Sequence, residues 1–409
     1  MTNVHRRRVL RSLGMSVVLC AALTAIPVLA QERTSVKIGY AISKTGANAG
    51  GAGITTLPNY QLWVKDVNDA GGLELPGGQR LPIEVVEYDD RSSAEEVVRA
   101  VERLANQDQV DFILPPWGTG FNLAVAPLFD RFNYPQLAVS AVTDKASDFV
   151  TRWDKSFWML GGGHDYTEAL AGLLTKAADE NKINKKIAMI SVADGFGIDL
   201  VTAARPSFEN AGFEVVYDVT YPVGTTDFTP ILNEAASGGA DTFVAFSYPP
   251  ETFALTQQAQ VANFNPKVLY LGVGTGFPAY GTNNGKNVEG IMSLGGIDPN
   301  NEANRAYRKR HEEVTGQAPD LWGSVVTYTS LQMLQEAIKR QGLDREAVAH
   351  ELSEGTFETV LGEVKMENNQ LRKLWFGGQW QNGQFVAVAP LDRDGVAEAI
   401  LPKPAWQAQ

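Results

Sequence analysis

Cysteine is almost absent from this sequence. Among its 409 residues, only Cys20 carries a thiol, and four residues are histidine. Because Cys20 lies in a leader that we expect to be cleaved, we predict a mature protein without disulfide bonds or cysteine-based metal sites. The histidines after the leader, His164, His311 and His350, lack the spacing of metal ligands. We therefore expect no metal and no cofactor.

Positive charge is scarce as well. Lysine and arginine number 35 against 47 aspartate and glutamate residues, which gives a formal net charge of −12 at pH 7. This balance argues against nucleic-acid binding, which requires clustered cations. The Gly-x-Ser-x-Gly motif of many hydrolases does not occur either. We assign no catalytic residue and predict that the protein is not an enzyme.

Long apolar runs are confined to the N-terminus. A basic stretch over residues 6–11 precedes an apolar stretch over residues 13–29, and Val28-Leu29-Ala30 has the small-residue pattern that signal peptidases cleave. We therefore predict that residues 1–30 are a signal peptide. After this segment no apolar stretch is long enough to span a bilayer.

The leader also bears on the route of export. The run Arg6-Arg7-Arg8 resembles a twin-arginine signal, so both the Sec route and the twin-arginine route stay open. Leu19 precedes Cys20, whereas a lipoprotein signal needs a small residue there, so we expect no lipid anchor. We predict a soluble periplasmic protein, with a retained N-terminal membrane anchor as the alternative.

The rest of the sequence alternates β-rich runs with amphipathic helical patterns, an order typical of a parallel sheet covered by helices. In the first part we expect strands over residues 36–42, 82–88, 112–114 and 136–139. Helices are expected over residues 55–68, 94–106 and 122–132. Together these segments form one doubly wound α/β unit.

The same pattern then starts again. Strands are expected over residues 186–190, 214–218, 241–246 and 268–271, and a helix over residues 198–210. The last three strands follow their counterparts by roughly 130 residues, a spacing too regular for unrelated elements. We therefore predict two similar doubly wound α/β lobes, with one long single domain as the alternative.

The C-terminal part is too short for a third lobe. It contains a strand over residues 291–294, helices over residues 302–315, 325–340 and 345–354, and a strand hairpin with Asn382-Gly383 at its turn. These pieces must join the existing lobes, so the chain crosses between them repeatedly and forms a multi-segment hinge. We assign residues 31–157 and about 294–370 to lobe 1, and residues 158–293 and about 371–409 to lobe 2.

Candidate ligand contacts follow from the strand ends, because small molecules bind beyond the carboxyl ends of strands in open α/β sheets. Glycine and hydroxyl residues are mixed with aromatic residues in these segments. The aromatic residues that could form the wall of a site are Trp117, Phe121, Phe196, Tyr248 and Phe277. The alternative is that the glycines form turns and the aromatic residues fill the base of each lobe.

One of these segments could bind an anion. Gly118-Thr119-Gly120 lies between a predicted strand and a predicted helix. The backbone N–H groups of a helix N-terminus favour negative charge, so this loop could hold the carboxylate of a ligand. Ser140 and Thr143 could add hydrogen bonds to a polar group.

Two other patterns suggest different chemistry. Gly272, Gly274 and Gly276 resemble a dinucleotide-binding loop, but Phe277-Pro278 follows where such a loop requires a helix. We therefore do not expect a nucleotide there. Asp89-Asp90 could be a pair of catalytic carboxylates. Because they precede two serines, we expect them instead to cap a helix.

Several motifs, taken in order, resemble one known family. They are Val36-Lys37-Ile38-Gly39 with Thr45-Gly46, the segment 67–72, the segment 86–90, Asp194-Gly195-Phe196-Gly197, Asp227-Phe228, and Pro319 with Trp322 and Tyr328. Over the whole mature chain, the sequence is similar to the type I periplasmic solute-binding proteins of ABC importers, specifically the leucine/isoleucine/valine-binding protein family. The resemblance implies two α/β lobes that hold a solute between them.

The resemblance also implies the ligand contacts. The loop that holds the ligand carboxylate corresponds to Trp117, Gly118, Thr119 and Gly120, and a second contact loop to Ala141, Val142 and Thr143. In the second lobe the matching positions are Phe196, Tyr248, Gly274 and Thr275. The family places an acid near Gly274 to pair with the ammonium of an amino acid, and here the sequence departs from it. The acids that remain near these strand ends are Asp165, Asp194 and Glu251.

We therefore predict a substrate-binding protein of an ABC transporter that captures an amino acid or related amide. The partners implied are the small-molecule solute and a permease with its ATPase, and we expect a monomer that binds no nucleic acid. An aromatic or other organic acid is the alternative ligand, because a buried ammonium without a partner costs several kcal/mol. A ligand-binding module of a sensory system is the alternative role.

Overall fold

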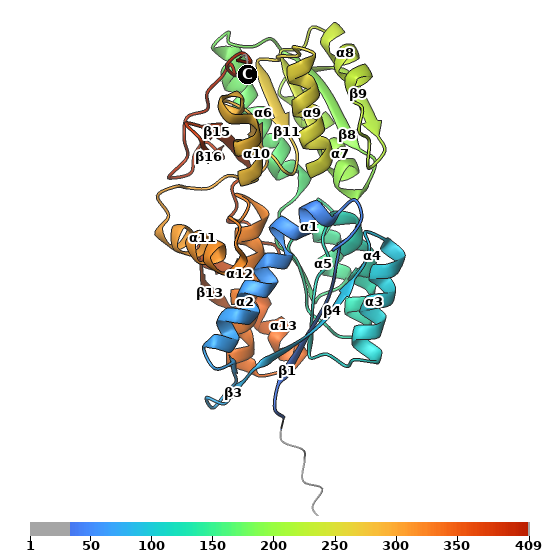
Figure 1. Ribbon diagram of the computed structural model, residues 1–409, viewed down its shortest axis with the longest axis vertical. Helices are drawn as coiled ribbons and strands as arrows, with labels where there is room; N and C mark the ends of the chain where they lie inside the picture. The colour runs from blue at the N-terminus through green and yellow to red at the C-terminus, as the bar shows by residue number, and fades with distance from the viewer. Residues whose placement is uncertain (1–32, 408–409) are drawn as a thin grey trace, which may run out of the picture. The chain divides into compact units, whose positions relative to one another are not determined.

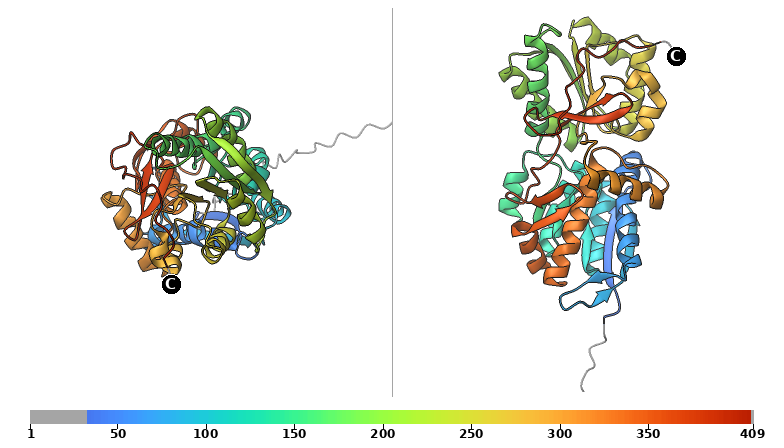
Figure 2. Two further views of the ribbon diagram at one scale, coloured as in Figure 1. Left: turned by 90° about the horizontal axis from the view of Figure 1, so that it is seen from above. Right: turned by 90° about the vertical axis from the view of Figure 1, so that its left-hand side faces the viewer.

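The strands form parallel sheets in two lobes, and helices cover both faces of each sheet (Figure 1, Figure 2). The structure is a computed structural model that describes residues 33–407. The predicted signal peptide lies outside these residues. Over the described range, no helix has both the length and the apolar character needed to cross a membrane.

Lobe 1 contains the first doubly wound unit and three helices from the C-terminal part. Its first elements are β1 (Val36–Ile42), α1 (Ala49–Thr55), α2 (Leu57–Asp69), β2 (Leu73–Glu74), β3 (Arg80–Leu81), β4 (Ile83–Asp89), α3 (Ala94–Asn106), β5 (Phe112–Leu114), α4 (Thr119–Arg131), β6 (Gln136–Ala138), α5 (Ala146–Arg152) and β7 (Ser156–Trp158). The later ones are α11 (Glu302–Thr315), α12 (Gly323–Gln341), α13 (Arg345–Glu354), β13 (Thr356–Thr359) and β14 (Gly362–Lys365). Strand β1 pairs in parallel with β4 and β5, and β6 pairs with β7.

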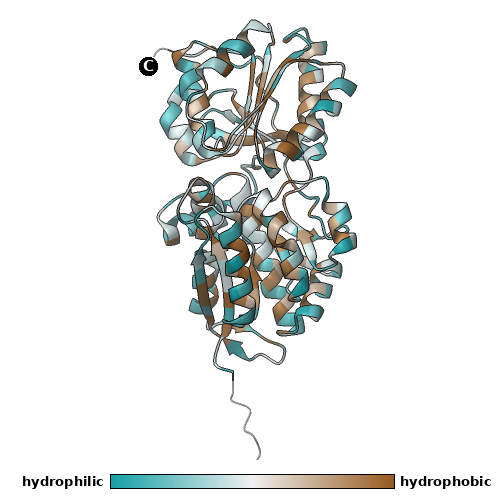
Figure 3. Ribbon diagram, turned by 90° about the vertical axis from the view of Figure 1, so that its right-hand side faces the viewer, coloured by the Kyte–Doolittle hydropathy of each residue, from teal (hydrophilic) through white to brown (hydrophobic). Residues whose placement is uncertain are grey.

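The alternating side chains of β1 explain the two-sided covering of its sheet. Ile38 and Tyr40 belong to the core cluster that includes Trp63 of α2. Ala41 points to the other face and packs in the cluster that contains Val101 of α3. Figure 3 shows the same pattern, with hydrophobic strands inside and hydrophilic outer faces on the helices. Both faces must therefore be buried, as a doubly wound fold requires.

Lobe 2 repeats this plan. Its elements are α6 (Gly163–Asp179), β8 (Lys186–Val192), α7 (Gly195–Asn210), β9 (Glu214–Tyr221), α8 (Thr229–Ser237), β10 (Thr242–Phe246), α9 (Pro249–Val261), β11 (Val268–Leu271), α10 (Pro278–Asn284), the 3-10 helix η1 (Gly285–Val288), β12 (Met292–Ser293), β15 (Gly377–Gln381) and β16 (Gln384–Ala389). The strand order is β16-β15-β12-β11-β10-β8-β9. Because β8 lies between β9 and β10 as β1 lies between β4 and β5, the predicted duplication is confirmed.

The predicted hairpin is also present. Strands β15 and β16 are antiparallel and join the edge of the sheet at β12. Asn382 and Gly383 both have positive φ, 51° and 78°, as a two-residue type I′ turn requires. The chain passes between the lobes after β7, after β12 and after β14, which gives the multi-segment hinge that the sequence predicted.

Several helices begin earlier than their apolar patterns indicated. Helix α4 begins at Thr119 and helix α7 at Gly195, because Gly118 and Asp194 are their N-cap residues. The helix expected over residues 55–68 corresponds to α2, and a further short helix, α1, precedes it. Thr56 separates them, and Pro58 lies in the first turn of α2, where proline is favourable.

The expectation that no helix follows the glycines near Gly274 is wrong. Helix α10 begins at Pro278, since a proline at the first position has the φ that a helix needs. These glycines serve close packing instead. A Cβ atom on Gly272 would lie 2.2 Å from the carbonyl oxygen of Ser247, and one on Gly274 would lie 2.9 Å from Cα of Pro249.

The expectation that Asp89 and Asp90 cap a helix is also wrong. The side chain that caps α3 is that of Ser93, which accepts a hydrogen bond from the backbone N–H of Glu96. Asp89 accepts hydrogen bonds from the backbone N–H groups of Lys44 and Thr45. Asp90 accepts one from the hydroxyl of Ser43. Both carboxylates therefore fasten the loop that follows β1.

Candidate functional site

A narrow cavity lies at the strand ends where the two lobes meet; its empty space is about 370 Å³, most of it too narrow for a water molecule or open to solvent. Lobe 1, including the start of α12, provides most of its wall, and lobe 2 provides the opposite side. The lining residues are Thr55, Trp117, Gly118, Thr119, Val139, Ser140, Val142, Leu160, Phe196, Tyr248, Val273, Trp322 and Gly323. None of these residues is Asp, Glu, Lys, Arg or His, so the wall offers aromatic surface and hydroxyl groups but no carboxylate or cation.

Three aromatic rings form the centre of this wall. The ring of Trp117 from lobe 1 lies 5.2 Å from that of Tyr248 in lobe 2. Phe196 stacks on the other side of Tyr248, with ring centroids 5.3 Å apart. The indole N–H of Trp117 donates a hydrogen bond of 2.9 Å to the hydroxyl of Thr55. Both lobes therefore contribute flat apolar surface to one ligand volume.

The polar end of Tyr248 is fixed by an acid behind the wall. Its hydroxyl donates to a carboxylate oxygen of Asp194 at 2.5 Å. The other carboxylate oxygen of Asp194 accepts the N–H of Gly197 in the first turn of α7. Burial raises the pKa of Asp194, and burial together with the Asp194 charge raises the pKa of Tyr248 well above its ordinary value. Tyr248 therefore keeps its proton near neutral pH.

Four helices begin at this cavity, and their first turns differ in what they can bind. Asp194 caps α7, and Asp320 accepts hydrogen bonds from the first backbone N–H groups of α12. Helix α9 begins with Pro249 and Pro250, which have no N–H group. Helix α4 has no side-chain cap. Of these four helices, α4 is the one whose start carries neither an acidic side chain nor a proline.

The start of α4 is held open for such a contact. Gly118 has φ of 96°, a conformation that favours glycine. Its N–H donates to the hydroxyl of Ser140 at 2.9 Å, and the hydroxyl of Thr119 accepts from the N–H of Val142 at 3.1 Å. The N–H groups of Thr119 and Gly120 have no partner within the helix. They offer positive charge to a ligand anion, and the helix dipole adds to it.

The structure brings some of the predicted contacts to the cavity and leaves others outside. The predicted residues that line it are Trp117, Gly118, Thr119, Val142, Phe196 and Tyr248. The predicted residues outside the lining are Gly120, Ala141, Thr143, Gly274 and Thr275. Two of the aromatic residues considered from the sequence, Phe121 and Phe277, also lie outside it.

The residues outside the lining have other roles. Thr143 donates a hydrogen bond of 2.5 Å to Asp199 of α7, and Lys145 forms an ion pair of 3.2 Å with the same carboxylate. A Cβ atom on Gly195 would lie 3.3 Å from Cα of Gly120, so the first turns of α4 and α7 approach closely. Thr275 is buried under lobe 2, where its carbonyl accepts the indole N–H of Trp380. These contacts join the lobes or support lobe 2.

None of the three acids considered as partners for an ammonium lines the cavity. Asp165 accepts a hydrogen bond from the N–H of Gly162 and forms an ion pair with Arg372. Asp194 is bound to Tyr248, as described above. Glu251 is buried, with one carboxylate oxygen accepting the N–H of Gly224 and the other without a partner among the described residues.

The buried Glu251 gives a testable effect on stability. Burial raises its pKa above the ordinary 4.5, so the folded state holds this proton more tightly than the unfolded chain. The contribution of Glu251 to stability is therefore present at low pH and is lost as the pH rises through the raised pKa. In Glu251→Gln this loss is absent. We expect the variant to unfold at pH 7 with a free energy higher by about 1 kcal/mol, and at pH 4 with no difference.

Urea unfolding at pH 4 and at pH 7 measures this difference. The exposed Glu358 supplies the control, because Glu358→Gln removes the same charge from a solvated position and should leave both values unchanged. A lower stability of Glu251→Gln at pH 7 would show that the ionised carboxylate is stabilising where it lies.

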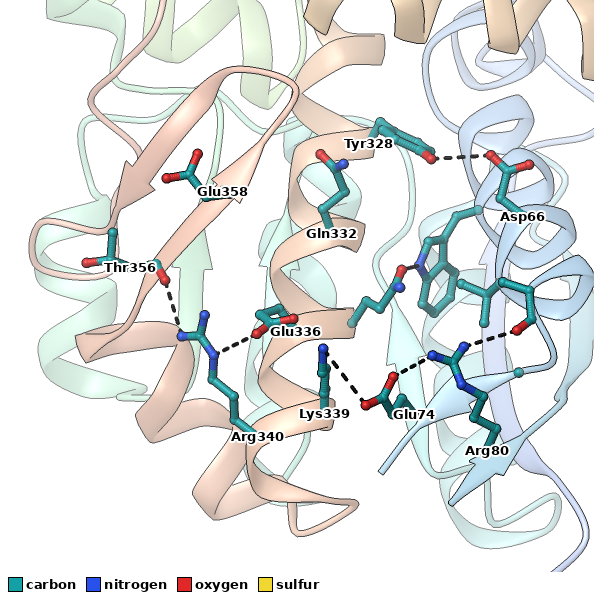
Figure 4. A pocket seen from close by; sticks show the side chains of 15 residues that line it. Asp66, Glu74, Arg80, Tyr328, Gln332, Glu336, Lys339, Arg340, Thr356 and Glu358 are labelled. Atoms are coloured by element: carbon teal, nitrogen blue, oxygen red, sulfur yellow. Dashed lines mark hydrogen bonds and ion pairs between the residues drawn. The ribbon is translucent and has the colours of Figure 1, made fainter. Parts of the chain in front are cut away.

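A wider hollow on lobe 1 lacks the features of a ligand site. It lies beside α2 and α12 and the β2–β3 hairpin (Figure 4). Most of its charged side chains pair with one another, with Glu74 bonded to Arg80 at 2.5 Å and Arg340 to Glu336 at 3.0 Å. Tyr328 donates to Asp66 at 3.4 Å. This hollow is thus a surface where the polar groups already satisfy each other.

Comparisons with known proteins agree with this arrangement. The family model described as periplasmic binding protein matches residues 35–384. A Leu/Ile/Val-binding protein homolog from Brucella suis biovar 1 is 23% identical over 366 residues, which cover 84% of this chain and 88% of that protein.

Two solved structures have the same fold. A solute binding protein of an ABC transporter from R. palustris, in complex with benzoate, has a TM-score of 0.75 at 20% identity and covers 91% of this chain and 97% of its own. A branched-chain amino acid transporter substrate binding protein from Streptococcus pneumoniae, in complex with isoleucine, has a TM-score of 0.72 at 20% identity and covers 86% and 98%. The chain therefore belongs to the periplasmic binding protein family, whose model it matches over most of its length, and the resemblance of its motifs to the leucine/isoleucine/valine-binding family is confirmed.

Proposed function

We propose that this protein captures an aromatic carboxylate between its lobes in the periplasm and delivers it to a membrane permease. The observation that carries this proposal is the composition of the cavity wall. It joins four aromatic side chains to one helix start without a side-chain cap, and it contains no side-chain carboxylate.

The carboxylate of the ligand is assigned to the start of α4. The N–H group of Thr119, which lines the cavity, can donate to this carboxylate, and hydrogen bonds to a charged acceptor are stronger than neutral ones. The ring of the ligand would then lie against Trp117 and Tyr248, whose rings come from opposite lobes. A single aromatic acid thus satisfies the polar and the apolar parts of the wall together.

An α-amino acid fits this wall less well. Its ammonium would be desolvated without a carboxylate within the lining, since Asp165, Asp194 and Glu251 all lie behind it. Asp194 contacts the wall through Tyr248, but both of its carboxylate oxygens already accept hydrogen bonds. The geometry therefore favours the organic acid, although the sequence ranked an amino acid or amide first.

The solved relatives support both ligand classes in this fold. The R. palustris protein holds benzoate, and the Streptococcus pneumoniae protein holds isoleucine. Because each shares only 20% identity with this chain, they establish the fold only. The ligand class must be argued from the residues of the cavity wall. Those residues are the ground for our choice.

The mechanism is closure about the hinge. Residues 31–157 and about 294–370 would move against residues 158–293 and about 371–409, and the ligand would stabilise the closed state because it contacts both lobes. No bond is made or broken in this process. We further propose export by the leader over residues 1–30 and action as a monomer with a permease and its ATPase.

Calorimetry with matched pairs tests the ligand class. Phenylalanine and leucine are compared with their deaminated acids, 3-phenylpropanoate and 4-methylpentanoate, and with benzoate. We expect the aromatic acids to bind and the amino acids to bind at least 100-fold more weakly, since an unpaired ammonium costs several kcal/mol and each 1.4 kcal/mol is about tenfold in affinity. Tight binding of the amino acids, together with no detectable binding of the deaminated acids, would overturn the proposal.

A further inference from the structure

A second groove lies between the lobes, apart from the cavity described above. Helix α11 and the segment before α12 form one side, and helix α10 and the β15–β16 hairpin form the other. It has about 1030 Å³ of space, part of it open to solvent. None of its lining residues lines the aromatic cavity. An occupant of the groove would therefore be a separate molecule.

The groove contains an arginine without a partner. Arg308 of α11 is half-buried, and its Nε–H is buried with no acceptor among the described residues. Glu312, one turn along the same helix, acts on it electrostatically, yet no ion pair joins them. A buried donor that has lost water without gaining an acceptor is unfavourable, so this position gains from any anion that can reach it.

The charged residues that line the groove have one sign. Arg305, one turn earlier, also lines the groove and donates a hydrogen bond of 2.8 Å to the carbonyl of Pro299. No aspartate or glutamate belongs to the lining. The whole protein has a formal net charge of −12, whereas the lining of this groove has two arginines and no acid, so it is locally positive. The groove thus favours an anion.

The remaining wall is mainly apolar. Pro278, Pro299 and Ala318 line the groove and are half-buried, so part of their apolar surface faces it. Trp380 and Phe385 of the hairpin are almost fully buried beneath, with their ring centroids 5.7 Å apart. Leu321 lies on the other side, and its backbone N–H donates to the carbonyl of Gly276 in lobe 2 at 3.1 Å. A simple inorganic anion would leave the exposed part of Pro278, Pro299 and Ala318 in water, whereas an anion with an apolar body would cover it.

We propose that this groove binds an organic anion with an apolar body, whose acidic group accepts hydrogen bonds from Arg308. The guanidinium can present Nε–H and one Nη–H to two oxygens of a carboxylate or sulfonate at once. The body of the molecule lies along Pro278, Pro299 and Ala318. The contact satisfies the buried Nε–H of Arg308.

A fluorescent organic anion, 8-anilinonaphthalene-1-sulfonate, tests the groove in the full mature chain. We expect saturable binding that Arg308→Gln weakens at least tenfold and that Arg308→Lys weakens less. The matched control is Lys309→Gln, which removes a positive charge from the next residue of α11, where the side chain is 80% exposed. This control and Trp117→Ala should leave the binding unchanged.

The uncharged analogue N-phenyl-1-naphthylamine should bind at least tenfold more weakly than the sulfonate. Equal binding of the sulfonate to Arg308→Gln and to the unsubstituted protein would overturn the proposal, and so would an equal loss in Lys309→Gln. Circular dichroism and urea unfolding show whether each variant is folded. Benzoate titrations of the same proteins report on the aromatic cavity, so a failure of the proposed function is distinguished from a failure of this groove.

Discussion

Replacing Trp117 by alanine is expected to weaken binding of the aromatic acid by about 100-fold or more. The indole lines the cavity from lobe 1, and it contacts Tyr248 across the lobes. Aromatic side chains at the centre of a binding site contribute most of the affinity when they are fully desolvated. Calorimetry with benzoate and 3-phenylpropanoate measures the dissociation constants.

Two matched variants separate this effect from general damage to lobe 1. Trp117→Phe keeps a ring at the position and should lose less than tenfold. Trp153→Ala removes a tryptophan of lobe 1 that stacks on Phe149 and does not line the cavity. It should bind as the unsubstituted protein does. Unchanged binding in a folded Trp117→Ala variant would remove the cavity from consideration as the ligand site.

Replacing Gly272 by alanine is expected to destabilise the protein by about 3 kcal/mol or more, or to prevent folding. The added Cβ atom would lie 2.2 Å from the oxygen and 2.4 Å from the nitrogen of Ser247, and both are backbone atoms. A backbone cannot rotate away as a side chain can. The ends of β10 and β11 would have to separate directly behind the cavity. Urea unfolding measures the loss.

Gly172 provides the control for this substitution. It lies within α6, and a Cβ atom there would meet no atom within 4 Å. Gly172→Ala should therefore raise the free energy of unfolding by about 0.5–1 kcal/mol, because alanine loses less backbone entropy in a helix than glycine does. If Gly272→Ala matched the stability of the unsubstituted protein, the close approach of the two strand ends would be refuted.

Much of the fold could be predicted from the sequence because hydrophobic periodicity reports burial directly. The helical spacing of Val97, Val101 and Leu104 predicted helix α3, and all three side chains are buried. Short elements carried too few residues for a pattern. Strand β7 has three residues and the β2–β3 hairpin has two in each strand, and they form only because neighbouring elements offer partners. Helix starts were missed where the first turn is polar or glycine-rich, as at Gly195.

The candidate site was less accessible to sequence reasoning. Trp117, Phe196 and Tyr248 stood out as aromatic residues after strands, and the structure places them in one wall. Thr55 and Trp322 also line the cavity, yet they come from the end of α1 and the start of α12. Their meeting depends on contacts between distant parts of the chain, which periodicity does not describe.

Neighbouring residues in a loop also face different ways. Thr143 follows Val142, which lines the cavity, but its hydroxyl points to Asp199 of the other lobe. A motif carried over as a continuous run therefore includes residues that join the lobes along with residues that contact the ligand. The direction of each side chain in such a loop is set by the tertiary fold.

The unequal capping of the helices around the cavity also limits the charge of a ligand. Asp194 and Asp320 occupy the starts of α7 and α12 with their own carboxylates, while the start of α4 is free. A first carboxylate on a ligand finds N–H donors at α4. A second carboxylate would face helix starts that already carry an acid, and like charges in a buried site repel strongly. The protein would thus bind monoanions more tightly than dicarboxylates of the same size. It would select its ligand by charge as well as by shape.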